Sequence, residues 1–172
     1  GVKNCFFADL CTGSGCIGIS YSLEVPASKG ILLDISDSAL HVAEKNRDRY
    51  GITDNRLSLC RFDLMTDDLP ADIDLLMSNP PYIDKNAMEA LEKELYYEPS
   101  LALFGGYDGL DFYRAICRRQ VENMKKGSYT VLELGIGQCK SVSELLKEAN
   151  AAVIDIIKDS AGIERTIVAE KR

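Results

Sequence analysis

The residues best suited to take part in chemistry are four consecutive ones, Asn79, Pro80, Pro81 and Tyr82. They follow the apolar run 73–78, which is typical of a buried strand. Because proline lacks a backbone N–H and keeps the residue before it extended, the strand must end here with Asn79 extended. The turn would present a carboxamide, an unpaired backbone carbonyl and a phenol ring. Such groups can hold a planar nitrogen, although an Asn-Pro pair alone also fits an ordinary strand-to-loop exit.

A glycine-rich segment, residues 9–18, follows the short apolar run 5–8 near the start of the chain. Gly13, Gly15 and Gly18 satisfy the spacing G-x-G-x-x-G between a predicted strand and a predicted helix. Glycine allows a tight bend and a close backbone approach to a ligand. Taken alone, this pattern fits a dinucleotide site, an S-adenosylmethionine site or a tight turn.

Carboxylates end the next two predicted strands. Asp34 follows the run 31–33, and Asp63 follows the alternating run 57–62. A carboxylate at the position of Asp34 can accept two hydrogen bonds from vicinal ribose hydroxyls. Its alternative role as a helix N-cap is better filled by Ser36 or Asp37. Asp63 could meet an adenine amino group or remain a solvated loop carboxylate.

These segments alternate with predicted helices, which is typical of an α/β protein with a parallel sheet. A fifth strand is predicted at 129–134 and the last two at 153–157 and 166–169. The connection between the last two is too short for a crossover helix, so this pair must be antiparallel. The sequence therefore predicts a doubly wound, mostly parallel seven-stranded sheet with an antiparallel last strand. Ligands bind such sheets at the carboxyl ends of the strands, where the glycine turn, both carboxylates and Asn79 would meet.

Three further predictions concern the helices and the long connection. Helical spacing places Arg47 at the edge of the apolar face of the second helix, and Ser141 is expected to cap the helix that runs to Ala149. The connection 83–110 should contain a short amphipathic helix at 87–95. A loop of this length directly after a proposed site is usually functional, so we expect it to shape the substrate site.

Length and composition limit the classes of protein. The 172 residues suit one domain, and 46% hydrophobic with 27% charged residues indicates a globular chain. The net charge of −7 argues against direct nucleic-acid binding and favours a neutral substrate or a basic protein partner. The six cysteines lack metal-site spacing, so we expect no metal and a reduced, cytoplasmic protein. No signal peptide or bilayer-spanning apolar run is present, so no membrane partner is expected.

Taken together, these motifs resemble those of class I methyltransferases and, within that group, the HemK/PrmC family. Members of this family methylate a protein glutamine on its side-chain nitrogen using S-adenosylmethionine. The resemblance covers nearly the whole chain and rests on the segments 9–17, 34–36, 79–83, 98–103 and 105–113. The Asn-Pro-Pro-Tyr motif also marks many other amino-methyltransferases, including adenine-specific DNA enzymes. The segment Gly-Gly-x-Asp-Gly-Leu-Asp is far more specific.

The resemblance implies a complete set of site residues. Asn79, Pro80, Pro81 and Tyr82 would be catalytic and hold the glutamine amide. The residues implied to bind S-adenosylmethionine, and its product S-adenosylhomocysteine, are Asp9, Cys11, Thr12, Gly13, Ser14, Gly15, Asp34, Ile35, Asp63, Leu64 and Asn79. Cys11 stands where the family often has glycine, and we expect an ordinary negative φ there.

The resemblance also implies a partner and a domain organisation. The expected substrate is a protein, a peptide chain release factor. Family members usually carry an N-terminal helical domain that helps to grip this substrate. No such domain precedes the first strand here, so we expect residues 1–172 to form the catalytic domain alone.

Other functions remain open at this point. A glutamine of a ribosomal protein, or the exocyclic amine of a nucleic-acid base, would keep the same chemistry. A nicotinamide-dependent oxidoreductase would account for the glycine pattern but leaves Asn-Pro-Pro-Tyr unexplained. A cofactor-binding module that only recruits a partner is the non-enzymatic alternative.

Overall fold

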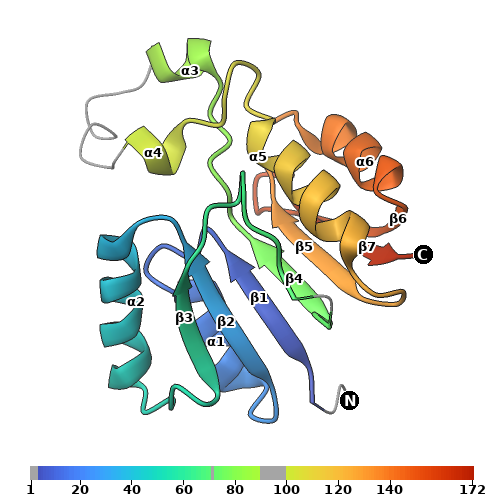
Figure 1. Cartoon of the computed structure of the whole chain (residues 1–172). Helices are drawn as coiled ribbons and strands as arrows, with labels where there is room; N and C mark the ends of the chain where they lie inside the picture. Colours follow the sequence, from blue (N-terminus) through green and yellow to red (C-terminus); the bar gives the residue numbers. More distant parts are fainter. Residues whose placement is uncertain (1–3, 71, 90–99) are drawn as a thin grey trace.

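One sheet of seven strands organises the protein, which we describe from a computed structural model at residues 4–70, 72–89 and 100–172 (Figure 1). The strand order is β3-β2-β1-β4-β5-β7-β6. All pairs from β3 across to β5 are parallel, whereas β7 is antiparallel to both β5 and β6. The predicted sheet is therefore confirmed. The strands are β1 (Phe6–Leu10), β2 (Lys29–Asp34), β3 (Leu57–Arg61), β4 (Leu75–Ser78), β5 (Tyr129–Glu133), β6 (Ala151–Lys158) and β7 (Glu164–Lys171).

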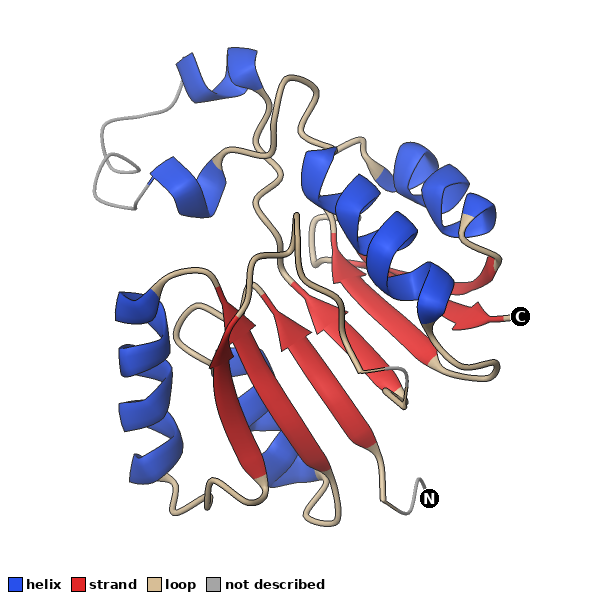
Figure 2. Cartoon of the chain, in the orientation of Figure 1, coloured by secondary structure: helices blue, strands red, loops and turns tan. Residues whose placement is uncertain are grey.

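Helices lie on both faces of the sheet, as Figure 2 shows. On one face lie α1 (Cys16–Glu24) and α2 (Asp37–Arg49). On the other lie α6 (Cys139–Glu148) and α5 (Asp111–Ala115), which continues as a π-helix, η2 (Ile116–Gln120), and a 3-10 turn, η3 (Val121–Asn123). Two short helices, α3 (Lys85–Glu89) and α4 (Ser100–Leu103), lie beyond the carboxyl ends of the strands.

The alternation of side chains along the strands produces one apolar core on each face. Phe7 packs with Ile19 of α1 and Ala43 of α2, whereas Leu10 and Leu76 belong to the core that includes α5 and α6. Successive residues of a strand point to opposite faces, so one strand supplies both cores. The two cores fix the strands and leave their carboxyl ends free to carry a site.

Two helix predictions differ from the structure. Ser141 lies inside α6, which begins at Cys139 after Gln138, so the predicted Ser141 cap is wrong. The physical reason is that the chain already turns at Gln138, whose backbone carbonyl accepts the first helical hydrogen bond from Val142. Helix α3 overlaps only the start of the helix predicted at 87–95, and the rest of that prediction lies outside the described residues. Among the described helices, none has the length and apolar character of a membrane span.

Arg47 is buried rather than at the edge of the apolar face of α2, with 6% of its surface exposed. Its guanidinium donates to the carboxylates of Asp54 (2.7 Å) and Asp48 (3.0 Å) and to the carbonyl of Leu57 (3.1 Å). This last bond ties the end of α2 to the first residue of β3. Sequence spacing alone did not distinguish a buried, fully bonded arginine from one at the edge of the face.

We predict that Arg47→Met lowers the free energy of unfolding by about 1–3 kcal/mol, because the buried Leu57 carbonyl loses its charged donor. Arg49→Met is the matched control, since Arg49 is an exposed residue of the same helix. Its effect should stay within about 0.5 kcal/mol. Urea unfolding of both variants measures the difference, and equal losses would contradict the anchoring role of Arg47.

Candidate active site

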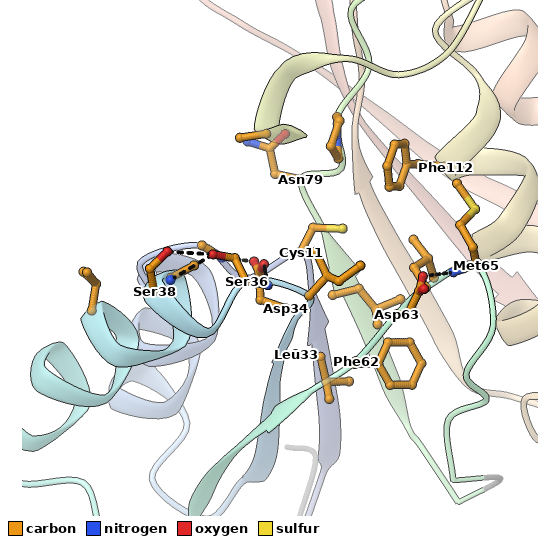
Figure 3. A pocket seen from close by; sticks show the side chains of 18 residues that line it. Cys11, Leu33, Asp34, Ser36, Ser38, Phe62, Asp63, Met65, Asn79 and Phe112 are labelled. Carbon is orange, nitrogen blue, oxygen red and sulfur yellow. Dashed lines mark hydrogen bonds between the residues drawn. The ribbon is translucent and has the colours of Figure 1, made fainter. Parts of the chain in front are cut away.

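A cavity of about 640 Å³ opens at the carboxyl edge of the sheet, where the strand order reverses between β1 and β4 (Figure 3). Its volume lies within the range of small-molecule sites, and its position is where ligands bind in doubly wound sheets. Figure 3 shows Asn79 and Phe112 on one side of the cavity, facing Asp34 and Asp63 on the other. Of the predicted site residues, those that line it are Cys11, Gly13, Asp34, Ile35, Asp63, Leu64, Asn79 and Pro81.

Four backbone amides of the glycine turn are already bonded within the protein. The amides of Thr12, Gly13, Gly15 and Gly18 all donate to acceptors within the protein, and that of Gly13 donates to Asp34 Oδ2 at 2.9 Å. A dinucleotide site uses amides of this turn to bind a pyrophosphate. The described residues that line the cavity also include no lysine or arginine. Both observations disfavour a phosphate-bearing ligand.

Cys11 adopts the left-handed conformation, with φ +56°, so the expectation of a negative φ there is wrong. Glycine normally takes this region, and another residue in it costs about 1–2 kcal/mol. The physical reason is the sharp turn at the end of β1, which brings the amide of Thr12 back to the carbonyl of Leu33 at 3.0 Å. Burial raises the pKa of the Cys11 thiol to about 12, so the thiol stays neutral and is no nucleophile near pH 7.

Asp9 lies beneath the glycine turn and is fully buried. Its Oδ2 atom accepts hydrogen bonds from the Thr12 hydroxyl (2.6 Å) and from the amide of Gly18 (2.9 Å). A Cβ atom at Gly18 would lie only 3.1 Å from this oxygen, so the close approach needs glycine. Asp9 Oδ1 has no partner among the described residues. Asp9 therefore supports the turn from below, and its predicted contact with a cofactor stays a prediction.

Burial raises the pKa of Asp9 to about 6, opposed by the bonds from Thr12 and Gly18. Because this pKa is raised in the folded state, the carboxyl group favours folding when it is protonated. Its contribution is fully present below about pH 4 and is lost as the pH rises through about 6.

We therefore predict that the stability of the wild type relative to Asp9→Asn falls between pH 4 and pH 7. The fall should be on the order of 3 kcal/mol, because one pKa unit corresponds to about 1.4 kcal/mol. Urea unfolding of both proteins across this range measures it, and the other carboxylates cancel in the comparison. A stability difference that is independent of pH would show that Asp9 titrates normally.

Two carboxylates reach the cavity from the ends of β2 and β3. Asp34 accepts hydrogen bonds from the amides of Gly13 (2.9 Å) and Ser36 (3.0 Å), which fix both of its oxygens at the cavity wall. The Ser36 hydroxyl caps α2 by accepting from the amide of Ala39 at 3.3 Å. Of the two predicted caps, Ser36 is the one used and Asp37 is the first residue of α2, so Asp34 is available to a ligand. Asp63 uses its Oδ1 atom for the amide of Met65 at 2.9 Å.

Asn79 stands directly beyond the last residue of β4. Ser78 pairs with Leu10 in the sheet, and its buried hydroxyl donates to the Leu10 carbonyl at 2.7 Å, which fixes the ends of both strands. Asn79 is exposed and its carboxamide makes no hydrogen bond with the described residues, while Pro80 and Pro81 are buried behind it. The carboxamide is therefore held at the cavity, and the described part of the chain leaves its hydrogen-bonding capacity unused.

The remaining predicted residues surround the cavity without lining it. Tyr82 is half-buried, and its hydroxyl donates to Glu133 Oε1 at 3.4 Å at the end of β5. Ser14 is exposed on the glycine turn, whereas Thr12 and Gly15 are buried in it. Pro80 is buried with Pro81 behind Asn79, and residues 79–82 together are called the rigid corner below.

Sequence reasoning missed two buried or half-buried glutamines. Gln120, in the π-helix, is 2% exposed and binds the loop after β3: its Oε1 accepts from the amide of Leu69 (2.9 Å) and its Nε2 donates to the carbonyl of Asp67 (2.8 Å). It thereby holds the loop that begins with Asp63. A glutamine on an otherwise apolar helical face was the available signal. Gln138, which precedes α6, offered none, because its partners lie in three separate loops.

The sheet order and the site at its carboxyl edge define the class I S-adenosylmethionine-dependent methyltransferase fold. The chain superposes on a methyltransferase from Pyrococcus furiosus with a TM-score of 0.73, covering 99% of this chain and 77% of that one at 14% identity. The magnesium protoporphyrin IX methyltransferase from Synechocystis, solved with bound S-adenosylmethionine, gives a TM-score of 0.66, covering 99% and 71% at 11% identity. The predicted fold class is thus confirmed.

The chain belongs to the family described as methyltransferase small domain, which it matches over residues 3–101, more than half of its length. It is 40% identical over 162 residues to a release factor glutamine methyltransferase of Cereibacter sphaeroides, covering 94% of this chain and 58% of that protein. It is also 40% identical over 130 residues to a ribosomal protein uL3 glutamine methyltransferase of Francisella tularensis, covering 76% and 41%. These relatives confirm the resemblance seen in the sequence. The chain spans about half the length of the curated relatives it matches.

Proposed function

We propose that this chain transfers a methyl group from S-adenosylmethionine to the side-chain amide nitrogen of a protein glutamine, with a peptide chain release factor as the substrate. The observation that carries the proposal is the Asn79 carboxamide, which bonds to none of the described residues and is held by two buried prolines at the cavity. A carboxamide is both a donor and an acceptor, so it can hold another amide by complementary hydrogen bonds. The named activity of the relatives from several bacteria supports the same chemistry.

The cavity suits an adenosyl group. Apolar side chains, among them Ile35, Phe62 and Leu64, supply walls for a flat base, and the carboxylates of Asp34 and Asp63 supply acceptors. Ribose hydroxyls and an adenine amino group are donors, so they match these acceptors. The lack of basic residues among the described lining suits a ligand whose sulfonium and amino groups are positive. When bound, S-adenosylmethionine supplies an activated methyl group.

The residues of the rigid corner would bind and orient the glutamine amide nitrogen, which is the nucleophile. An amide nitrogen reacts poorly because its lone pair is delocalised into the carbonyl. Asn79 Oδ1 and the carbonyl of Pro80 would each accept one N–H of the substrate amide, which favours pyramidal nitrogen as positive charge develops on it. The Tyr82 ring would pack against the amide plane. Holding the nitrogen in line in this way can supply roughly 7–11 kcal/mol of the barrier reduction. The proton would then leave to water.

A second protein substrate has specific support. The similarity to uL3 glutamine methyltransferases is as high in identity as that to the release factor enzymes, although over a shorter segment. The amide chemistry would be the same, and only the protein that carries the glutamine would differ. Methyl incorporation measured side by side into a release factor, ribosomal protein uL3 and DNA distinguishes these substrates. Methylation of DNA alone would reject the proposal.

We predict that S-adenosylhomocysteine raises the melting temperature by about 5–10 °C at a hundredfold excess over its Kd, whereas NAD leaves it unchanged. Asp34→Asn should abolish most of the shift, because one of the two ribose acceptors is lost. Asp37→Asn is the matched control, since Asp37 is exposed in the first turn of α2. A shift with NAD, or an equal shift in both variants, would contradict this cofactor site.

We predict that Asn79→Ala lowers kcat at least about 100-fold, the loss typical of removing one preorganised hydrogen-bonding group. The Kd of S-adenosylhomocysteine, measured by calorimetry, should change far less than kcat, because Asp34 and Asp63 still supply the acceptors for the ribose and the adenine. Asn55→Ala, in an exposed turn before β3, is the control and should retain wild-type turnover. Unchanged turnover in Asn79→Ala would refute the assignment of this residue.

A further inference from the structure

We infer that Gln138 is a positioning residue that clamps the Asn79–Tyr82 corner against two neighbouring loops and so sets the catalytic geometry. The inference rests on the proposed function for its catalytic consequence, but the clamp itself is a property of the fold. It concerns three segments far apart in the sequence: the corner itself, the loop 105–109 before α5, and the turn 135–138 after β5.

The side chain of Gln138 makes three hydrogen bonds, one to each segment. Its Nε2 atom donates to the carbonyl of Tyr82 (3.0 Å) and to the carbonyl of Gly109 (3.2 Å). Its Oε1 atom accepts from the amide of Gly135 (3.0 Å). Both N–H donors and the carbonyl oxygen of the carboxamide are thus used. Only glutamine or asparagine offers two donors and an acceptor in one flat group.

Gln138 does not use its side chain to cap its own helix. The residue precedes α6, and its side chain makes no capping hydrogen bond to that helix. A side chain at this position commonly satisfies the free amides at the start of the helix. Here it reaches away from α6, to loops 56 and 29 residues away in the sequence. The bonds therefore serve the loops and not the helix.

Glycines allow the loops to approach Tyr82 closely enough for this arrangement. A Cβ atom at Gly105 would lie 2.7 Å from Tyr82 Cα, and one at Gly109 would lie 2.5 Å from the Tyr82 carbonyl oxygen. A Cβ at Gly135 would lie 3.0 Å from the Tyr82 ring. Real Cβ contacts are almost never as short as the first two and rarely as short as the third, so side chains at these positions would press against the corner. The backbone of these glycines thus packs directly on Tyr82, and the hydrogen bonds of Gln138 hold the loops in this position.

The clamp acts two to three residues from the proposed catalytic groups. Buried prolines link Asn79 rigidly to Tyr82, so a shift at the Tyr82 carbonyl moves the Asn79 carboxamide and the Pro80 carbonyl with it. Small displacements of an aligned reacting group cost large factors in rate. The proposed cofactor carboxylates, Asp34 at the end of β2 and Asp63 after β3, bond to other described residues and not to the clamp. Loss of Gln138 should therefore affect turnover and leave cofactor binding intact.

The test compares Gln138→Met, which removes all three hydrogen bonds at similar volume, with Lys140→Met, an exposed residue in the first turn of α6. Amide hydrogen exchange is followed by NMR at Ile83 and Gly105, which bond to the carbonyls of Leu103 and Ile83. Both amides should exchange at least tenfold faster in Gln138→Met, while amides of β4 and β5 keep their rates. Unchanged exchange at Ile83 and Gly105 would overturn the clamp, whether or not the protein is active.

Turnover of a purified release factor is measured on the same proteins. Gln138→Met should lower kcat at least tenfold, with the Kd of S-adenosylhomocysteine unchanged within twofold, and Lys140→Met should match the wild type. If the wild type methylates no glutamine substrate, the proposed function fails while the exchange rates still decide the clamp. If the wild type is active and Gln138→Met keeps its kcat, the positioning role fails.

A second variant, Gln138→Glu, keeps the test valid if Gln138→Met fails to fold. Gln138→Glu places a carboxylate opposite two carbonyl oxygens, and protonation of this group restores one donor. The exchange rates of Ile83 and Gly105, relative to wild type at each pH, should therefore recover as the pH is lowered from 8 to 5. A purely volume-filling role for residue 138 predicts no such recovery.

Discussion

The site depends on one constraint: the strand β4 must end where two prolines deny it further ladder hydrogen bonds. Parallel β1 and β4 are neighbours at the point where the strand order reverses, so a forced end of β4 lies beside the glycine turn that ends β1. The buried bond from Ser78 to Leu10 locks these two ends together. Proline after Asn79 favours an extended backbone there, and the residue is exposed. The rest of the sheet serves to hold that corner at a fixed distance from the carboxylates of β2 and β3.

The same edge of the sheet disfavours phosphate-bearing ligands, because it offers them few free amides and, among the described lining residues, no basic side chain. A glycine turn with free amides attracts phosphate, but here the amides of Thr12, Gly13, Gly15 and Gly18 are occupied by Asp34, Asp9 and backbone carbonyls. The carboxylates then dominate the local field and favour neutral or positive groups. The literal G-x-G-x-x-G spacing is therefore compatible with two chemistries, and the hydrogen bonds of the turn decide between them. This is why the pattern was uninformative on its own and informative once its partners were known.

The sequence predicted those parts of the site that depend on local chain properties. The double proline, the strand-terminal carboxylates and the Ser36 cap each follow from backbone geometry within a few residues, and all are found where expected. The conformation of Cys11 could not be predicted in this way, because its positive φ is imposed by the return of the chain to β2. The partners of Gln138 likewise depend on three loops meeting in space. Local pattern recognises a residue type; it does not show which distant carbonyl that residue faces.

The Asn79 carboxamide differs from the polar groups around it, which already have hydrogen-bond partners in the fold. Buried polar groups are normally satisfied, and leaving one without a partner costs free energy. Two glutamines satisfy polar groups around the corner: Gln138 bonds to the Tyr82 and Gly109 carbonyls, and Gln120 bonds to the loop after β3. The Asn79 carboxamide is the exception among these groups, and its exposure lets water satisfy it until a ligand arrives. The carboxamides of Gln138 and Gln120 are already bonded to these loops, so they are not available to Asn79, which remains oriented for a group that comes from outside.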